Sequence, residues 1–259
     1  MGEYFWDTQM DYLKNTREKM WNDDYFEFLV RNVWKLNTAK HIIDFGCGYG
    51  FLGTKLLPLL PEGCTYTGID IGEELLKEAR KVFDKSPFQY DFIHADLKEY
   101  IPQKQYDIAI CQAVLRHIPQ PYEILKKMVD SVIPSGMVIC IEVNRRMENA
   151  GWFIHGSNYD ISENDALLKK QWENELENGG RDYLLGIKVP VYMEQLGLKD
   201  IGVRVNDFVE FVSPTQNKNR HLENVDYFLK SNNIRIHKDD KEMLSLIKAR
   251  SLLISYGTK

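Results

Sequence analysis

The feature that most constrains the fold is a regular alternation of strand-like and helix-like segments between residues 41 and 143. Five short runs are rich in β-branched and aromatic residues, and amphipathic segments such as 73–83 and 121–132 separate them. The strand-like runs are 41–46, 65–70, 89–96, 106–112 and 136–143. Strands that alternate with helices are joined by crossover connections and therefore pair in parallel. The sequence predicts an α/β fold with a doubly wound, mostly parallel sheet.

Segments outside this alternation add three further features. Residues 1–38 are rich in aromatic side chains at helical spacing and are expected to form an N-terminal helical lid segment, ahead of one domain over 39–259. The alternation breaks at 144–188, which predicts an inserted cap, and 213–250 is expected to be a second, helical insertion. The later elements expected are strands over 200–212 and 251–258 and helices over 189–198, 221–230 and 238–249.

Charge and composition argue against several classes of partner. The net charge is −5 and the lysines are interspersed with acids, which is not the footprint of a nucleic-acid-binding surface. No run approaches the roughly 20 apolar residues that span a bilayer, and the first residues do not resemble a signal peptide, so a cytoplasmic location is expected. The four cysteines lack metal-ligand spacing, which predicts buried free thiols and no metal site.

A glycine-rich turn follows the first predicted strand. Gly46, Gly48 and Gly50 occupy alternate positions directly after an apolar run, where glycine permits a tight turn and close approach of the backbone to a ligand. Asp70 lies twenty residues after Gly50, at the end of the second strand, where a carboxylate can accept hydrogen bonds from the hydroxyls of a ribose. Together these residues predict a nucleoside-binding edge of the sheet.

The same turn is compatible with two classes of cofactor. Gly48, Gly50 and Gly53 match the G-x-G-x-x-G pattern of nicotinamide and flavin enzymes, although one such match is weak evidence. Other observations favour a methyl donor: Asp44 ends the strand ahead of the glycines, Asp96 follows the third strand, and the fourth strand leads into C-Q-A-V-L-R-H-I-P.

The ordered motifs D-F-G-C-G-Y-G, G-I-D, A-D-L and Y-D-I-A-I-C-Q-A-V-L-R-H-I-P resemble those of class I S-adenosylmethionine-dependent methyltransferases of the small-molecule type. The match covers roughly residues 40–143. This resemblance implies S-adenosylmethionine as the cofactor and a Rossmann-like, seven-stranded sheet of order 3-2-1-4-5-7-6. Its last strand, here within 251–258, would run antiparallel to the others.

The resemblance also implies a set of cofactor-binding residues. The glycine turn would contact the methionine portion, Asp70 the ribose and Asp96 the adenine amino group. The residues carried over are Gly46, Cys47, Gly48, Asp70, Ile71, Asp96, Leu97 and Gln112. Because related enzymes often fold an N-terminal helix over the donor, Tyr12 and Arg17 are hypothesised to reach it as well.

Methyl transfer from a sulfonium donor requires mainly orientation, so a base is needed only if the acceptor must lose a proton. The candidate bases are His117, Glu142 and His155, with backbone binding as the structural alternative for Glu142. The candidate substrate contacts, placed after the fifth strand and in the cap, are Asn144, Arg145, Trp152 and Tyr159.

The expected function is methyl transfer to a small-molecule oxygen or nitrogen acceptor. Gln112-Ala113-Val114-Leu115 stands where enzymes that methylate nucleic-acid bases carry D-P-P-Y or N-P-P-Y, so nucleic acid is disfavoured as an acceptor. The alternatives are a nicotinamide-dependent oxidoreductase that uses the Gly48–Gly53 turn, a non-catalytic sensor or scaffold that binds the donor, and, with less support, methylation of protein or RNA. The sequence gives no indication of oligomeric state.

Overall fold

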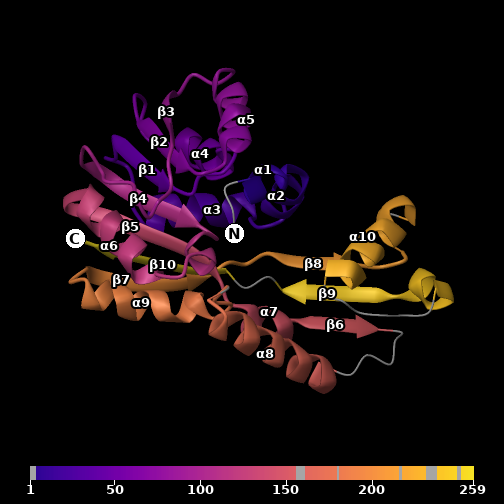
Figure 1. Cartoon of the computed structure of the whole chain (residues 1–259). Coiled ribbons are helices and arrows are strands. Elements are labelled where there is room, and N and C mark those ends of the chain that lie inside the picture. Colours follow the sequence, from indigo (N-terminus) through magenta and orange to yellow (C-terminus); the bar gives the residue numbers. More distant parts are fainter. Residues whose placement is uncertain (1–3, 156–160, 180, 216–217, 232–237, 250–251) are drawn as a thin grey trace.

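The computed structural model describes residues 4–155, 161–179, 181–215, 218–231, 238–249 and 252–259 (Figure 1). Its centre is a seven-stranded sheet with the order β3-β2-β1-β4-β5-β10-β7. The strands are β1 His41–Phe45, β2 Thr65–Asp70, β3 Gln89–His94, β4 Tyr106–Gln112, β5 Val132–Val143, β7 Lys199–Val205 and β10 Leu252–Thr258. The first five strands pair in parallel, and β10 is antiparallel to both β5 and β7. The predicted order 3-2-1-4-5-7-6 and the antiparallel last strand are confirmed.

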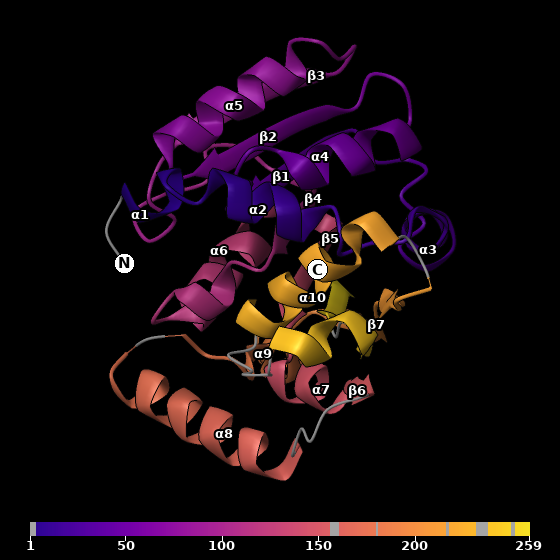
Figure 2. The same ribbon diagram turned by 90° about the vertical axis from the view of Figure 1, so that its right-hand side faces the viewer.

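Helices cover both faces of this sheet, as a doubly wound fold requires. The helices are α4 Phe51–Leu56, α5 Glu73–Phe83, α6 Pro121–Ser131 and α9 Leu185–Gln195. Side chains alternate between the two faces along β1. Ile42 therefore lies in the apolar core beneath α4 and α5, whereas Ile43 and Phe45 lie in the core beneath α6 and α9. Figure 2 shows α5 on one side of the sheet and α6 and α9 on the other.

The N-terminal segment docks on the start of α5. It contains α1 Tyr4–Asp7, α2 Met10–Arg17 and α3 Asp23–Phe28, followed by a π-helical turn at Leu29–Val33. Gly72, the N-cap residue of α5, has no side chain that could cap the helix. Asp7 caps it instead, because the Oδ1 atom of Asp7 accepts the N–H groups of Glu74 and Leu75 at 2.9 and 3.2 Å. Lys14 and Glu78 add an ion pair at 2.7 Å. A carboxylate from outside the sheet thus ties α1 to the main domain.

One strand from each insertion and the end of the strand predicted over 200–212 form a second, three-stranded sheet that the sequence analysis missed. Its antiparallel order is β6-β9-β8, and α10 packs on one face. The elements are α7 Arg145–Ala150, β6 Trp152–His155, α8 Ile161–Glu177, β8 Val209–Val212, α10 Lys218–Ser231, a 3-10 turn at Lys238–Met243 and β9 Ser245–Ala249. The description of the 213–250 insertion as helical is therefore incomplete.

Two of the predicted elements in this region were wrong. The helix expected over 238–249 ends in β9, where Leu246 and Lys248 are buried and Ile247 is exposed, which is the period of a strand. The strand expected over 200–212 is divided between the two sheets at Asn206. The buried amide of Asn206 donates to the Met20 carbonyl at 2.5 Å and accepts from the Leu252 N–H at 3.3 Å, which holds the chain out of both ladders.

All four cysteines are buried and free, as predicted. None of the helices in the described ranges is long and apolar enough to cross a bilayer.

Candidate active site

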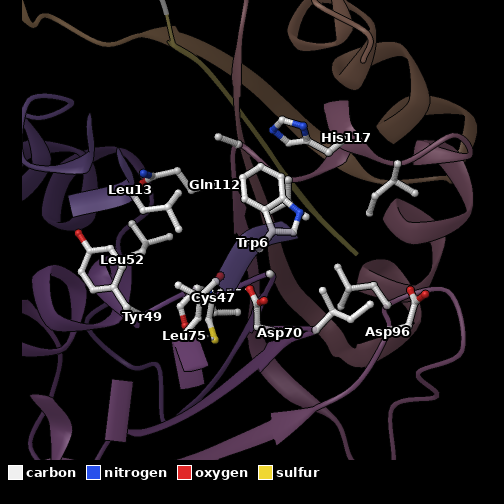
Figure 3. A pocket seen from close by; sticks show the side chains of 18 of the residues that line it. Trp6, Leu13, Cys47, Tyr49, Leu52, Asp70, Leu75, Asp96, Gln112 and His117 are labelled. Carbon is white, nitrogen blue, oxygen red and sulfur yellow. Dashed lines mark hydrogen bonds between the residues drawn. The ribbon is translucent and has the colours of Figure 1, made fainter. Parts of the chain in front are cut away.

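A cavity of about 250 Å³ lies at the carboxyl ends of the central strands (Figure 3). The turn after β1, the ends of β2 and β4 and the loop after β3 line it, and Trp6, Leu13 and Arg17 of the N-terminal segment cover it. The predicted cofactor residues that line it are Gly46, Cys47, Gly48, Asp70, Ile71, Asp96, Leu97, Gln112 and Arg17. Lining residues that the sequence analysis did not assign to the site include Trp6, Leu13, Tyr49, Leu75, Ile118 and Gly179. The strand ends therefore meet at one site, as their positions in sequence predict.

Tyr12 is the exception among the predicted donor contacts. Its side chain is 50% exposed and does not line the cavity. Leu13 and Arg17 of the same helix do line it, because residues one and five positions further along α2 share the face that turns inward. The structure does not support a donor contact by Tyr12.

The glycine turn presents open backbone to the cavity at one position. Gly48 has φ of +57°, and a β-carbon built there would meet no atom within 4 Å. A β-carbon on Gly50 would instead lie 2.8 Å from the Phe83 ring, and one on Gly53 would lie 2.6 Å from the Tyr66 ring. The second half of the G-x-G-x-x-G match thus serves helix packing, while Gly48 leaves room for a ligand.

Asp70 is locked between this turn and the start of α5. Its Oδ2 accepts the Gly48 N–H and its Oδ1 accepts the Gly72 N–H, both at 2.8 Å. Burial raises its pKa, and the backbone hydrogen bonds oppose that shift. Because each carboxylate oxygen can accept more than one hydrogen bond, Asp70 keeps acceptor capacity for a pair of ligand hydroxyls.

Asp96 and Leu97 form the far end of the cavity. Asp96 Oδ1 accepts the Lys98 N–H at 2.9 Å, and its Oδ2 lies 3.3 Å from Lys98 Nζ. Leu97 is buried in the core beneath α6. A polar acceptor beside an apolar side chain suits a flat heterocycle with an exocyclic amine.

Asp44 is a buried acid at the floor of the cavity. Burial raises the pKa of Asp44 to about 7, opposed by the Tyr66 hydroxyl, which donates to Oδ2 at 2.5 Å. The nearby charge of Asp70 raises it further. Asp44 therefore changes its charge close to neutral pH, within the lining of the cavity.

This shift makes stability depend on pH with a defined sign. Because the pKa of folded Asp44 exceeds its ordinary value of 3.8, its contribution is fully present below about pH 4 and is lost as the pH rises through about 7. Relative to Asp44→Asn, the wild-type free energy of unfolding should therefore fall by about 4 kcal/mol between pH 4 and pH 8. Urea unfolding of both proteins across this range measures the difference. A difference that does not vary with pH would contradict this placement of Asp44.

His117 lines the cavity but is a poor candidate for a general base. Its Nε2 accepts the Arg116 Nε–H at 3.0 Å, and its buried Nδ1 has no hydrogen-bond partner among the described residues. Burial lowers the pKa of His117 to about 2, with further lowering by the charges of Arg116, Arg181 and Arg17. The Trp6 ring meets its edge at 4.8 Å between centroids. A neutral imidazole with an occupied Nε2 does not accept a proton readily.

Glu142 supports the backbone and does not line the cavity. Its Oε1 accepts the N–H groups of Val114 and Leu115 at 2.9 and 2.7 Å, and the side chain is fully buried. These bonds fix the loop after β4, in which Ala113 has φ of +56°. Glu142 thus binds backbone N–H groups, which was the structural alternative for this residue. Its assignment as a base is not supported.

The remaining predicted residues lie apart from the cavity or are committed to other contacts. Gln112 lines the cavity, but its amide oxygen accepts from Trp21 Nε1 at 3.1 Å and its amide nitrogen donates to the Met20 sulfur.

The predicted residues after the fifth strand lie elsewhere. Asn144 is buried, and its Oδ1 accepts the Met147 N–H at 3.4 Å at the start of α7. His155 is exposed in β6. Of the three predicted bases, only His117 lines the cavity. The Arg145 N–H donates to the Tyr183 carbonyl at 3.0 Å, Trp152 begins β6, and Tyr159 lies outside the described residues.

Comparisons with known proteins agree with this geometry. Residues 36–190 match the family model described as "Methyltransferase domain". Ubiquinone biosynthesis O-methyltransferase of Klebsiella pneumoniae is 33% identical over 109 residues, which cover 41% of this chain and 44% of that protein. The chain thus spans about half the length of the curated relatives that it matches.

Solved structures share the fold at low sequence identity. Phosphoethanolamine N-methyltransferase 2 of Haemonchus contortus, in complex with phosphomonomethylethanolamine and S-adenosylhomocysteine, superposes with a TM-score of 0.56 at 11% identity, covering all of this chain and 60% of that one. An O-methyltransferase family protein of Burkholderia thailandensis gives a TM-score of 0.52 at 12% identity, with coverage of 98% and 58%.

The fold, the strand-end cavity and the family match define one class of protein. The chain belongs to the methyltransferase-domain family, with the fold of the class I S-adenosylmethionine-dependent methyltransferases, and S-adenosylmethionine is its cofactor. The cavity fits this group, because Gly48 leaves space for the donor and Asp70 retains acceptor capacity toward it. The match favours this donor over the nicotinamide alternative.

Proposed function

We propose that the protein transfers the methyl group of S-adenosylmethionine to a small-molecule oxygen or nitrogen acceptor. The observation that carries the proposal is the covered cavity in which Gly48, Asp70 and Asp96 meet at three strand ends. The curated relatives named as ubiquinone biosynthesis O-methyltransferases support a small-molecule acceptor. A nucleic-acid acceptor has no comparable support.

Each donor portion has a proposed binding group. The backbone of Gly46, Cys47 and Gly48 contacts the methionine portion, Asp70 binds the ribose hydroxyls, and Asp96 with Leu97 binds the adenine. Ile71 lies beside Asp70 in the lining and packs against the nucleoside.

The N-terminal segment completes the site by excluding water. The donor supplies an already electrophilic methyl group, so the protein has mainly to align donor and acceptor, which can contribute roughly 7–11 kcal/mol. Trp6 and Leu13 close the cavity over the strand ends, and the Asp7 cap on α5 fixes their position. The Nε2 of His117 accepts the Arg116 Nε–H and Oε1 of Glu142 accepts two backbone N–H groups, so the proposal assigns proton removal to neither residue.

Arg17 is the group best placed to bind the carboxylate of the donor's methionine portion. It lines the cavity, its hydrogen bond is a weak one of 3.6 Å to the Met20 sulfur, and it forms no ion pair with any described residue. Burial, together with the charge of Arg116, lowers its pKa to about 10, so it stays charged at neutral pH. A partly buried cation that forms no ion pair is stabilised by an anionic ligand group.

Replacing Arg17 with glutamine should therefore weaken binding of S-adenosylhomocysteine, the demethylated donor, by about tenfold to 100-fold, since a charged hydrogen-bonded contact contributes about 1.5–3 kcal/mol. Isothermal titration calorimetry measures this loss. Tyr12→Phe, on the exposed face of the same helix, is the matched control and should bind as wild type does. Equal affinity of Arg17→Gln and wild type would remove Arg17 from the donor site.

The proposed activity is tested by incubating the protein with donor carrying a radiolabelled methyl group and a panel of small phenols, carboxylic acids and amines. Label should appear in at least one acceptor with wild type, and much more slowly with Asp70→Asn at the same low donor concentration. Tight donor binding without transfer to any acceptor would favour the sensor or scaffold alternative.

A further inference from the structure

The small second sheet carries apolar side chains on both of its faces. On one face, a residue of each strand is buried in a cluster with residues of α10, and these are Ile154, Val212, Leu246, Val225 and Leu229. Because side chains alternate along a strand, the neighbouring strand residues point to the opposite face. Those neighbours are Phe153, Phe211 and Ile247. Antiparallel sheets with one face in water carry polar residues there, so this pattern is typical of a sheet that is covered on both sides.

The outward residues form a row across the sheet. Phe153 of β6 and Phe211 of β8 both pair with Ile247 of the middle strand β9, so the three side chains lie side by side. Phe153 is 57% exposed, Phe211 51% and Ile247 43%. Val209, two residues before Phe211 on the same face, is 57% exposed. These four residues are called the outer apolar face. Figure 1 shows the strands that carry it extending to one side of the central sheet.

No lysine, arginine or acid points outward from these three strands as the structure describes them. The other outward positions are His155, Ser245 and Ala249. The charged residues of the strands, Glu210 and Lys248, each follow or precede an outward residue by one position and so lie on the α10 side. Nucleic acids and anionic lipid surfaces are bound through lysine and arginine. The outer apolar face therefore fits an uncharged, apolar protein surface.

The row of three is also complementary to itself. It reads Phe-Ile-Phe in either direction across the sheet, so a two-fold axis parallel to β9 places Ile247 on its own copy and Phe153 opposite Phe211 of the second copy. The four side chains of the face expose roughly 400 Å². A standard interface buries about 800 Å² per partner, a little over half of it apolar. The outer apolar face thus supplies most of the apolar area that a stable dimer needs.

We propose that the second sheet is a dimerisation surface, on which a second copy of this chain packs sheet against sheet through the outer apolar face. Facing sheets of this kind lie about 10 Å apart with their strands nearly aligned, which brings the aromatic rings of the two copies into contact. The proposal goes beyond methyl transfer and does not depend on it, because none of the four residues lines the cavity.

Analytical ultracentrifugation of the full chain at tens of micromolar tests the proposal. The wild type should sediment as a dimer, with twice the mass of one chain. Ile247→Lys places two like charges at the two-fold axis, and Phe211→Lys places a charge against Phe153 of the other copy. Each should weaken dimerisation by about 100-fold or more, because it removes a contact at the centre of the interface and the dimer contains that contact twice.

Two further variants separate loss of contact from loss of fold. Ile101→Lys makes the same kind of change at an exposed residue of the loop after β3, outside the second sheet, and should leave the dimer intact. Phe211→Thr keeps a residue type that favours strands and should still weaken dimerisation by about tenfold or more. Thermal melts establish that each variant is folded.

Two results would overturn the proposal. One is a wild-type chain that stays monomeric at hundreds of micromolar, and the other is a dimer that folded Ile247→Lys and Phe211→Lys leave intact. A monomeric wild type that co-sediments with vesicles of uncharged phosphatidylcholine would also overturn it, and would assign the outer apolar face to a lipid surface.

Discussion

Asp70→Asn should weaken binding of S-adenosylhomocysteine by about 100-fold or more, the largest effect expected from any isosteric change in this protein. Both carboxylate oxygens already accept backbone N–H groups, from Gly48 and Gly72. An asparagine amide nitrogen would face one of these donors, so the residue would lose a backbone contact and its capacity for one ribose hydroxyl together. Calorimetric titration measures the change.

Asp91→Asn is the matched control for this prediction. Asp91 is exposed on β3 and does not line the cavity, so the same change of charge there should leave donor affinity unaltered. An affinity of Asp70→Asn within about threefold of wild type, with both variants folded, would show that Asp70 serves only to shape the turn, because loss of a ligand contact to a charged group costs more than that.

Gly48→Ala should reduce donor affinity by about tenfold or more, while Gly63→Ala should not change it. Both glycines have positive φ, +57° and +81°, and a β-carbon at either would meet no atom within 4 Å. Each substitution should therefore lower the free energy of unfolding by a similar amount, about 1–2 kcal/mol of backbone strain. Gly48, however, lines the cavity, so a methyl group added there is expected to compete with the donor, whereas Gly63 lies in the turn before β2 and does not line it.

Comparing the two variants separates strain from occlusion. Chemical unfolding reports the shared loss of stability, and titration with S-adenosylhomocysteine reports the loss specific to Gly48. Similar donor affinities for the two variants would mean that the open space at Gly48 is not where the donor lies.

The central sheet and the donor edge were predictable because their signals are local. A strand of the central sheet is apolar over its whole length, and the residues that follow it at the sheet edge are fixed by its end, so Gly46, Asp70 and Asp96 converge wherever the strands are parallel. The position of β10 followed from the resemblance. The family match decided between the two cofactor classes, because glycines that pack closely against Phe83 and Tyr66 are compatible with either class.

The parts that were not predicted depend on contacts between distant segments. The second sheet pairs β6 with β9 across about ninety residues, and no pattern within either short strand specifies that partner. Asp7 as the cap of α5 and Glu142 as the support of the loop after β4 are likewise side-chain contacts with remote backbone. An acid at a strand end looks the same in sequence whether it faces a ligand or a loop, which is why Glu142 was taken as a candidate base.

The most direct test of the account is a pair of calorimetric titrations of the wild-type chain, one with S-adenosylhomocysteine and one with NADH. We expect one binding site for S-adenosylhomocysteine and no heat of binding for NADH. Binding of NADH in the absence of S-adenosylhomocysteine binding would contradict the assignment of the strand-end cavity to the methyl donor.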